Sequence, residues 1–275
     1  MTIVEKCLYI VATPIGNLND ITFRAVEVLK SADIILCEDT RNSSRLLTHF
    51  QIDNKKLMSY HKFNEKSRVE NIKRLILEEN KKVALVSDAG TPCISDPGRI
   101  LVNTLSQENI KIAPVPGACA LVAFLSATYK QDEPFVFLGF LPRTFEAQKK
   151  LLLKNSFNDI VFYESANRLL KTLDNIAKIF GEDVVVSVGR ELTKIYEQIK
   201  TCKVIDLIDF YKTNILKGEI VVIIYKNNDN NNFALDLELL NKIEQLKNKG
   251  FSKKDIVTIL VTLYGFNKNE VYNKI

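Results

Sequence analysis

Residues 83–98 read VALVSDAGTPCISDPG, an apolar run followed by a loop at 87–98 that is rich in Pro, Gly, hydroxyl and carboxylate groups. The run at 83–86 is typical of a buried strand. Two prolines and two glycines restrict the backbone of this loop more than a simple connection requires. Because ligands of open α/β sheets bind at the carboxyl ends of strands, the loop is the first place where we expect a functional site.

Short apolar runs alternate with longer helical patterns on both sides of this loop. This alternation predicts an α/β fold in which parallel strands are covered by helices. The expected strands are 7–12, 33–37, 83–87, 112–115, 135–140, 160–164, 184–188 and 220–225. The expected helices are 21–30, 68–77, 146–153, 169–180 and 204–211, with a buried helix in 115–129.

The length of 275 residues fits two compact domains. We predict an N-terminal α/β domain at 1–117 and a C-terminal α/β domain at 118–226. Five Asn and one Asp then occupy 227–232, so 227–234 is predicted to be an Asn-rich linker. The remaining residues, 235–275, are predicted to form a separate helical module.

The pattern of this module is that of three short helices. Leucine and isoleucine recur at helical spacing in 237–246, and Gly250 is placed to end that helix. Ser252-x-x-Asp255 and Asn267-x-x-Glu270 are capping boxes for two further helices. Three helices with a Gly-containing tight turn are typical of a helix-turn-helix unit.

The basic surplus of the chain is concentrated in this module. The net charge is +5, of which residues 241–275 carry +4 and the other 240 residues only +1. This concentration favours contact with nucleic acid, although a solvated dimerisation or capping bundle remains the alternative. The candidate RNA-binding residues are Lys247, Lys249, Lys253, Lys254 and Lys268.

Several classes of protein are excluded by motif. No two of the ten glycines are two or five positions apart, which removes both the G-x-G-x-x-G dinucleotide loop and the G-x-x-x-x-G-K phosphate loop. The longest charge-free stretch, 112–129, is interrupted by Pro and Gly, so we expect no membrane span. The N-terminus has no secretory pattern, and a cytoplasmic protein is expected. The five cysteines are scattered, so we expect no metal site.

Other polar loops also follow or precede expected strands. They read TPIGN (13–17), EDTR (38–41), PGAC (116–119), FYESANR (162–168), GRELTK (189–194) and KGEI (217–220). Each alone is compatible with an ordinary turn. Polar clusters that converge from two domains instead predict a shared site at the facing edges of the two sheets.

At this level of detail the sequence resembles a known family. The resemblance rests on TPIGNLNDIT (13–22), EDTR (38–41), SYH (59–61), the loop at 87–98, LGFLPR (138–143), FYES (162–165) and RELTK (190–194). These strings look like those of ribosomal RNA small subunit methyltransferase I, the 16S rRNA cytidine-2′-O-methyltransferases, a branch of the tetrapyrrole methylase superfamily. The resemblance covers essentially the whole chain, including a basic helical tail.

The resemblance implies two α/β domains with S-adenosylmethionine (AdoMet) bound in the cleft between them. It also implies a homodimer and, as acceptor, a cytidine 2′-hydroxyl in the decoding region of 16S rRNA within the small ribosomal subunit. Carried over by motif, the cofactor-binding residues are Ile15, Asp88, Ala89, Gly90, Thr91, Ile94, Ser95, Pro116, Gly117, Ala118, Tyr163, Glu191, Leu192, Gly218 and Glu219.

The chain departs from the family pattern at three places. It has PGACA at 116–120 where the family usually has Pro-Gly-Pro-Ser-Ala, and ESANR at 164–168 where the family has Glu-Ser-Pro-His-Arg. EDTR is followed by Asn42-Ser43 rather than by His-Thr. If the protein is active, the missing Pro, Ser and His are therefore not indispensable here.

The expected chemistry requires activation of a ribose hydroxyl. A protonated 2′-hydroxyl is a weak nucleophile, so a base or a polarising cation nearby should assist methyl transfer. The candidate proton acceptors are Asp39, Glu38 and His61, the last because the usual pKa of histidine lies near neutrality. A dedicated base can also be absent, with positioning of the hydroxyl supplying most of the catalysis.

Cations form the second set of candidates. Lys194 or Arg190 is expected to polarise the hydroxyl, and Arg41 to contact a phosphate. The alternative for Arg190 and Glu191 is an interdomain ion pair. Two other functions also remain open at this stage: a tetrapyrrole C-methyltransferase of the same superfamily, and a non-catalytic ribosome-assembly factor on the same fold.

Overall fold

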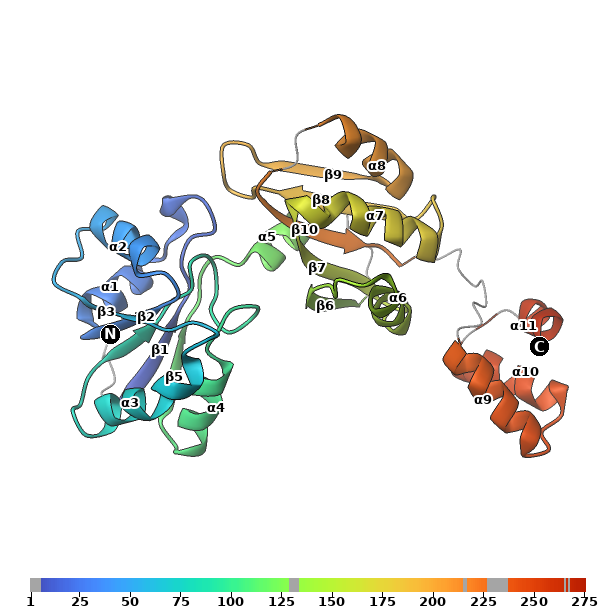
Figure 1. Ribbon diagram of the computed structural model, residues 1–275, viewed down its shortest axis with the longest axis horizontal. Coiled ribbons are helices and arrows are strands. Elements are labelled where there is room, and N and C mark those ends of the chain that lie inside the picture. Colours follow the sequence, from blue (N-terminus) through green and yellow to red (C-terminus); the bar gives the residue numbers. More distant parts are fainter. Residues whose placement is uncertain (1–5, 129–133, 215–216, 227–236, 265, 267) are drawn as a thin grey trace.

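The computed structural model describes residues 6–128, 134–214, 217–226, 237–264, 266 and 268–275. In these ranges the chain forms two five-stranded sheets with helices packed on them, followed by three further helices (Figure 1). The α/β class with a helical C-terminal part, predicted from the sequence, is confirmed. The predicted linker at 227–234 lies outside the described residues.

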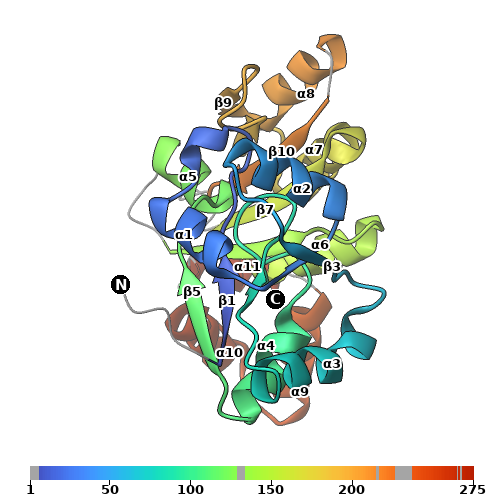
Figure 2. The ribbon, with the colours of Figure 1, turned by 90° about the vertical axis from the view of Figure 1, so that its left-hand side faces the viewer.

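The first sheet is entirely parallel, with strand order β3-β2-β4-β1-β5. Figure 2 shows β1 and β5 side by side. Its strands are β1 (Cys7–Val11), β2 (Ile34–Cys37), β3 (Lys56–Ser59), β4 (Val83–Leu85) and β5 (Lys111–Val115). The short turn η1 (Leu18–Asp20) follows β1, and the helices are α1 (Phe23–Ser31), α2 (Thr40–His49), α3 (Glu65–Leu77) and α4 (Arg99–Gln107).

Both faces of this sheet are buried because its side chains alternate between two cores. Tyr9 and Val11 pack on the side of α1 and α2, whereas Leu8 and Ile10 pack on the side of α3 and α4. A parallel sheet covered on both faces needs such strands without polar side chains. Because all five strands are parallel, their carboxyl ends lie at the same end of the sheet, and the loops after β1, β2 and β4 meet there.

The second sheet is mixed, which corrects the expectation of parallel strands throughout. Its order is β6-β7-β10-β8-β9, and only β6 and β7 are parallel. A connection of seven residues joins β8 to β9, too short for the crossover that a parallel pair requires. The strands are β6 (Phe135–Phe140), β7 (Asp159–Ser165), β8 (Val185–Arg190), β9 (Gln198–Lys203) and β10 (Glu219–Ile224).

One face of the second sheet is covered by α6 (Phe145–Lys154), α7 (Ala166–Phe180) and α8 (Val204–Thr213). The other face receives α5 (Ala120–Ala127), whose Phe124 is buried against Gly189. A helix covering 115–129 was expected, but α5 is shorter because β5 runs to Val115 and the N-cap Cys119 is still in extended backbone, with φ −147° and ψ 120°. It is also only partly buried, since 62% of Val122 is exposed.

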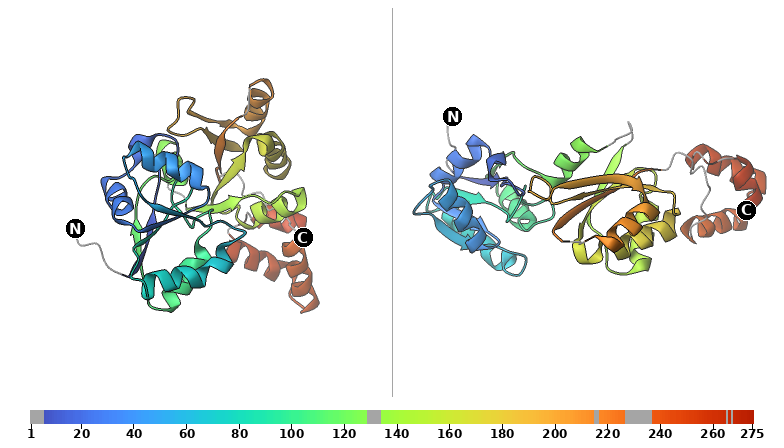
Figure 3. Two further views of the ribbon diagram at one scale, coloured as in Figure 1. Left: turned by 60° about the vertical axis from the view of Figure 1, so that its left-hand side comes forward. Right: turned by 90° about the horizontal axis from the view of Figure 1, so that it is seen from above.

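The C-terminal helices α9 (Leu237–Asn248), α10 (Lys253–Tyr264) and α11 (Lys268–Lys274) share a hydrophobic core of their own. They lie beyond the second sheet in Figure 3. Gly250 has a φ of +86° at the end of α9, as expected of a helix stop. The capping box forms: Asp255 N donates to Ser252 Oγ (3.2 Å) and Ser252 N to Asp255 Oδ2 (3.1 Å). The second expected cap, Asn267, lies outside the described residues.

Within the described residues, no helix combines the length and the apolar character needed to cross a bilayer. The two sheets fall within the ranges 1–117 and 118–226, so these boundaries are kept as the proposed domain limits.

Candidate active site

A cavity of about 420 Å³ lies between the two sheets. From the first sheet it is lined by the loops that follow β1, β2 and β4, and from the second by the ends of β6 and β7 and the start of β10. Most of the residues predicted to bind the cofactor line it: Ile15, Asp88, Ala89, Gly90, Thr91, Ile94, Ser95, Tyr163, Leu192, Gly218 and Glu219.

Three loops of the first sheet are tied together at this cavity. Thr13 and Gly90 exchange two backbone hydrogen bonds, of 2.9 and 3.0 Å. Thr91 Oγ1 donates to the carbonyl of Ala118 (3.1 Å), which fixes the loop at 116–119 although Pro116, Gly117 and Ala118 do not themselves line the cavity. Gly90 has a φ of +79°, and a β-carbon there would lie 3.2 Å from Ile15 Cγ2. A glycine thus lets the backbone form the cavity wall.

The polar lining is acidic. Glu38, Asp88, Asp96, Glu164 and Glu219 line the cavity, and no lysine or arginine is among its lining residues within the described part of the chain. Burial, followed by the negative charges of Asp96 and Asp88, raises the pKa of Glu38 to about 7. Burial also raises the pKa of Asp96. An acidic, partly apolar cavity is suited to a cationic organic ligand.

Asp39 lies next to Glu38 but in a different environment. It is the N-cap of α2, and its carboxylate accepts hydrogen bonds from Arg41 N (2.8 Å), Nε (3.0 Å) and Nη2 (2.6 Å). The hydrogen bonds from the Arg41 side chain, and then from its backbone N–H, lower the pKa of Asp39 to about 2. Asp39 does not line the cavity, so its carboxylate is less suited to accept a proton than that of Glu38.

Asp88 joins the β2–α2 loop to the long loop after β4. Its carboxylate accepts hydrogen bonds from Asp39 N (3.2 Å) and Asn42 Nδ2 (3.2 Å). Asn42 thus supplies Asp88 with a neutral hydrogen-bond donor.

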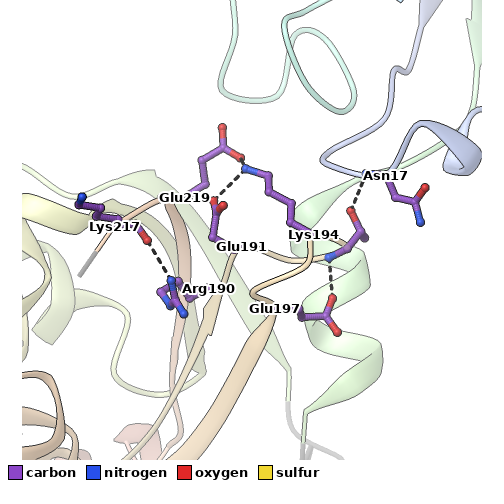
Figure 4. Close-up of polar contacts among 8 residues, drawn as sticks. Asn17, Arg190, Glu191, Lys194, Glu197, Lys217 and Glu219 are labelled. Atoms are coloured by element: carbon purple, nitrogen blue, oxygen red, sulfur yellow. Dashed lines mark hydrogen bonds and ion pairs between the residues drawn. The ribbon is translucent and has the colours of Figure 1, made fainter. Parts of the chain in front are cut away.

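The loop after β8 contains two residues in left-handed backbone, Glu191 (φ +51°) and Thr193 (φ +65°). Figure 4 shows Lys194 between two carboxylates, with Nζ 2.8 Å from Glu191 Oε1 and 3.0 Å from Glu219 Oε2. Glu191 also accepts a hydrogen bond from Glu219 N (3.0 Å). Backbone strain of this kind persists only where surrounding contacts enforce it. Glu191 supports the cavity-lining Gly218–Glu219 segment without itself lining the cavity.

The same loop touches the first sheet's side of the cavity. Asn17 N donates to Thr193 Oγ1 (3.1 Å), and Thr193 N donates to Glu197 (Figure 4). Gly16 is packed against the Lys194 side chain and has no room for a β-carbon. Lys194 is therefore held by acidic partners and by Gly16, and it is not among the residues that line the cavity. Its role as a polarising cation stays a prediction.

The other candidate residues lie outside the cavity lining. Arg190 Nη1 donates to the Lys217 carbonyl (3.3 Å), so it holds the loop before β10. No ion pair between Arg190 and Glu191 is present among the described contacts. His61 is part of a local turn, in which its N donates to Asn64 Oδ1 (2.8 Å).

Among the candidate RNA-binding residues, Arg41 is largely exposed, at 85% of its side-chain surface. Two of the candidate lysines make contacts within the C-terminal helical module. Lys247 Nζ donates to the Ile275 carbonyl (3.2 Å), and Lys253 Nζ lies 4.6 Å from the centre of the Tyr272 ring. Lys254 on α10, Lys268 on α11 and Lys249, directly after α9, are exposed.

Some cavity residues were missing from the predicted set. They are Asp96, Cys119, Ala120, Phe140, Glu164, Ser165, Ile220 and Val221. All of them except Val221 belong to the loops and motifs quoted above, so the sequence contained a signal for the other seven. Tyr163 was in the predicted set, and its hydroxyl accepts a hydrogen bond from Leu121 N (3.2 Å), which attaches the start of α5 to the second sheet.

Residues 7–208 match the model of the family Tetrapyrrole (Corrin/Porphyrin) Methylases. The chain belongs to this family. Its fold is similar to that of a cobalt precorrin-4 methyltransferase from cobalamin biosynthesis (TM-score 0.61, 22% identity, covering 80% of this chain and 95% of that one). It is also similar to diphthine synthase (TM-score 0.63, 14% identity, covering 80% and 90%).

Curated relatives of this tetrapyrrole methylase carry the name ribosomal RNA small subunit methyltransferase I. The relative from Rickettsia prowazekii (strain Madrid E) is 42% identical over 98% of this chain and 96% of its own length. That from Escherichia coli O157:H7 is 39% identical over 96% and 93%. A shorter relative from Hydrogenobaculum sp. (strain Y04AAS1) is 43% identical over 80% of this chain and 96% of its own. The chain is therefore a member of this group of tetrapyrrole methylases.

Proposed function

We propose that this protein transfers a methyl group from AdoMet to the ribose 2′-hydroxyl of a cytidine in the decoding region of 16S rRNA, on the small ribosomal subunit. The observation that carries the proposal is the similarity to relatives named as rRNA small subunit methyltransferases. It extends over 96–98% of the chain at 39–42% identity and so includes the basic C-terminal helices, which lie beyond the family match at 7–208.

The residues of the cavity fit AdoMet as the methyl donor. Its volume of about 420 Å³ is within the range of small-ligand sites. Ile15, Leu192 and Val221 supply apolar walls, and the carboxylates of Asp88, Asp96 and Glu219 favour a ligand that carries positive charge. When bound, AdoMet supplies an electrophilic methyl group on a sulfonium, whose transfer leaves a neutral thioether.

Glu38 is the proton acceptor that the geometry supports best. It lines the cavity, and its pKa of about 7 matches the pH at which a general base should work. Asp88 holds the β2–α2 loop beside it, and Asp96 contributes the largest charge effect on its pKa. Glu38 would accept the proton of the hydroxyl at a carboxylate oxygen, while the surrounding loops position the ribose.

A tetrapyrrole macrocycle is a less well supported acceptor. Relatives that match over 96–98% of this chain at 39–42% identity are named ribosomal RNA small subunit methyltransferase I, whereas the cobalt precorrin-4 methyltransferase is 22% identical and covers 80% of this chain. The likeness to the cobalt precorrin-4 methyltransferase therefore concerns the fold.

The experiment is to incubate the protein with labelled AdoMet and small subunits that lack the modification. We expect label in the RNA with the wild type, and a loss of about 10²-fold or more in kcat with Glu38→Gln, while the Kd for AdoMet changes less than about threefold. Tight AdoMet binding with no label in any rRNA would contradict the proposal.

A further inference from the structure

Phe140, in the motif LGFLPR at 138–143, lines the cavity at the end of β6. In β6, side chains alternate: Val136 and Leu138 pack on the side of α6 and α7, and Phe137 packs on the opposite side, which faces the cavity. Continued alternation would place Phe140 on the side of α6 and α7. Its presence in the cavity lining therefore needs a structural cause.

The cause is a one-residue bulge. Phe137 pairs with Val161 and Phe140 pairs with Tyr163, so β6 advances by three residues over the distance in which β7 advances by two. Gly139 lies within the bulge, with a φ of +66°. Bulges re-aim side chains, and a glycine in left-handed backbone is a common way to build one. No atom lies within 4 Å of the place where a β-carbon of Gly139 would be, so the glycine serves backbone conformation rather than close packing.

The Phe140 ring packs against an aromatic side chain, yet more than half of the residue is exposed to solvent. The centre of the Phe140 ring lies 5.7 Å from that of Tyr163, at 60° between the planes, and Phe137 contacts the same tyrosine at 4.9 Å. Yet 57% of Phe140 remains exposed. By contrast, Ile15 and Leu192 in the same cavity are at most 8% exposed. Phe140 thus forms part of the open rim, where a polymer can reach, rather than of the enclosed wall.

The segment after Phe140 is held in place and ends in a cation. Arg168 Nη2 donates to the carbonyls of Leu141 (2.8 Å) and Pro142 (3.0 Å), and Gln148 Nε2 donates to the latter (2.8 Å). Arg143 follows directly and is exposed. Phe140 and Arg143 are thus an exposed ring and an exposed cation three residues apart on a fixed segment, and aromatic rings and arginines are the side chains with which proteins hold unpaired nucleotides.

We propose that Phe140 is a positioning residue for the acceptor RNA: an unpaired base stacks on its ring at the cavity rim, and Arg143 contacts a neighbouring phosphate. This inference rests on the proposed rRNA substrate and specifies how that substrate is held. Stacking tolerates any base, so Phe140 contributes affinity and orientation rather than base identity.

The test compares Phe140→Ala, Phe140→Tyr and Arg143→Ala with a control, Phe157→Ala, a similarly exposed phenylalanine (52%) outside the cavity lining. The substrate is small subunits that lack the modification. We expect Phe140→Ala to raise KM for subunits between about fivefold and a hundredfold. Phe140→Tyr should stay within about threefold of the wild type, and Phe157→Ala should match it. The Kd for AdoMet should change less than twofold in every variant.

Two results would overturn the proposal: an unchanged KM in Phe140→Ala, or an equal loss of AdoMet affinity, which would assign the ring to the methyl donor. Filter binding of the same subunits to the AdoMet-saturated protein gives a readout that does not need turnover. If the wild type binds subunits without methylating them, the proposed function fails, but the Kd of Phe140→Ala for subunits still decides the role of the ring. If the wild type does not bind subunits, both fail.

Discussion

Gly218 lies directly against the carboxylate of Glu191, in backbone with a φ of +100°, and a β-carbon at position 218 would overlap that carboxylate. The contact places Glu191 where it receives hydrogen bonds from Lys194 Nζ (2.8 Å) and Glu219 N (3.0 Å). Burial opposes ionisation of Glu191, but the hydrogen bonds from Lys194 and Glu219 outweigh it and lower its pKa. The cavity edge formed by β10 therefore depends on a glycine.

Gly218→Ala should weaken AdoMet binding by about tenfold or more and destabilise the protein by at least about 1 kcal/mol, because it combines backbone strain with a steric overlap. The matched control is Gly181→Ala, at a φ of +92° with no atom near the added carbon. It should share the cost in backbone strain but leave AdoMet affinity unchanged. Calorimetric titration and urea unfolding of both variants measure this, and equal AdoMet affinities would contradict it.

The raised pKa of Glu38 predicts a pH-dependent stability. Because the folded state holds the proton of Glu38 more tightly than the unfolded state, this group's contribution is fully present below its usual pKa of 4.5 and is lost as the pH rises to about 7. Glu38→Gln should therefore be more stable than the wild type at pH 8, by on the order of 1 kcal/mol after solvent screening, but not at pH 4. Urea unfolding at the two pH values measures the difference, with Asp174→Asn on the exposed side of α7 as control. An equal gain at both pH values would refute the assignment.

The neighbouring carboxylates predict different kinetic behaviour. For the wild type, kcat should rise with pH through an apparent pKa near 7, and Glu38→Gln should remove that dependence. Asp39→Asn keeps a capping side chain on α2 but loses the ion pair with Arg41, so we expect less than a tenfold loss in kcat with the pH profile intact. If Asp39→Asn abolished turnover and Glu38→Gln did not, the roles of the two residues would be exchanged.

The C-terminal helices are predicted to contribute affinity for RNA through exposed lysines. The triple variant Lys249→Glu, Lys254→Glu, Lys268→Glu avoids Lys247 and Lys253, whose contacts hold the module together. It should weaken binding to small subunits by about tenfold or more and flatten the salt dependence of binding, while AdoMet affinity stays the same. Unchanged affinity at every salt concentration would assign the helices to another partner.

The α/β class and most elements were predictable because periodicity and strand-end loops are local properties. The strands at the sheet edges were harder: β3 (KLMS) is short and partly exposed, and β9 (QIKTCK) alternates with polar residues. The direction of the strands could not be predicted from the sequence pattern either. An alternation of strands and helices looks the same whether β8 and β9 are parallel or antiparallel.

The candidate site, like the fold, could be predicted only in part from the sequence. Loops after buried strands indicated where the cavity would lie, but not which of two adjacent carboxylates would face it. Glu38 and Asp39 differ only once Arg41 folds back onto Asp39 and Asp96 approaches Glu38. The place of Phe140 depends on one extra residue in the register of β6, whereas regular alternation would put its side chain on the opposite face of the sheet.

Mapping the methylated nucleotide decides whether this protein modifies a cytidine ribose in 16S rRNA. Small subunits that lack the modification would be incubated with the protein and labelled AdoMet, and the RNA digested and separated by fragment and by nucleoside. We expect a single labelled 2′-O-methylcytidine in the decoding region of 16S rRNA, absent with Glu38→Gln. Label on a base, on another nucleoside, or only on protein would contradict it.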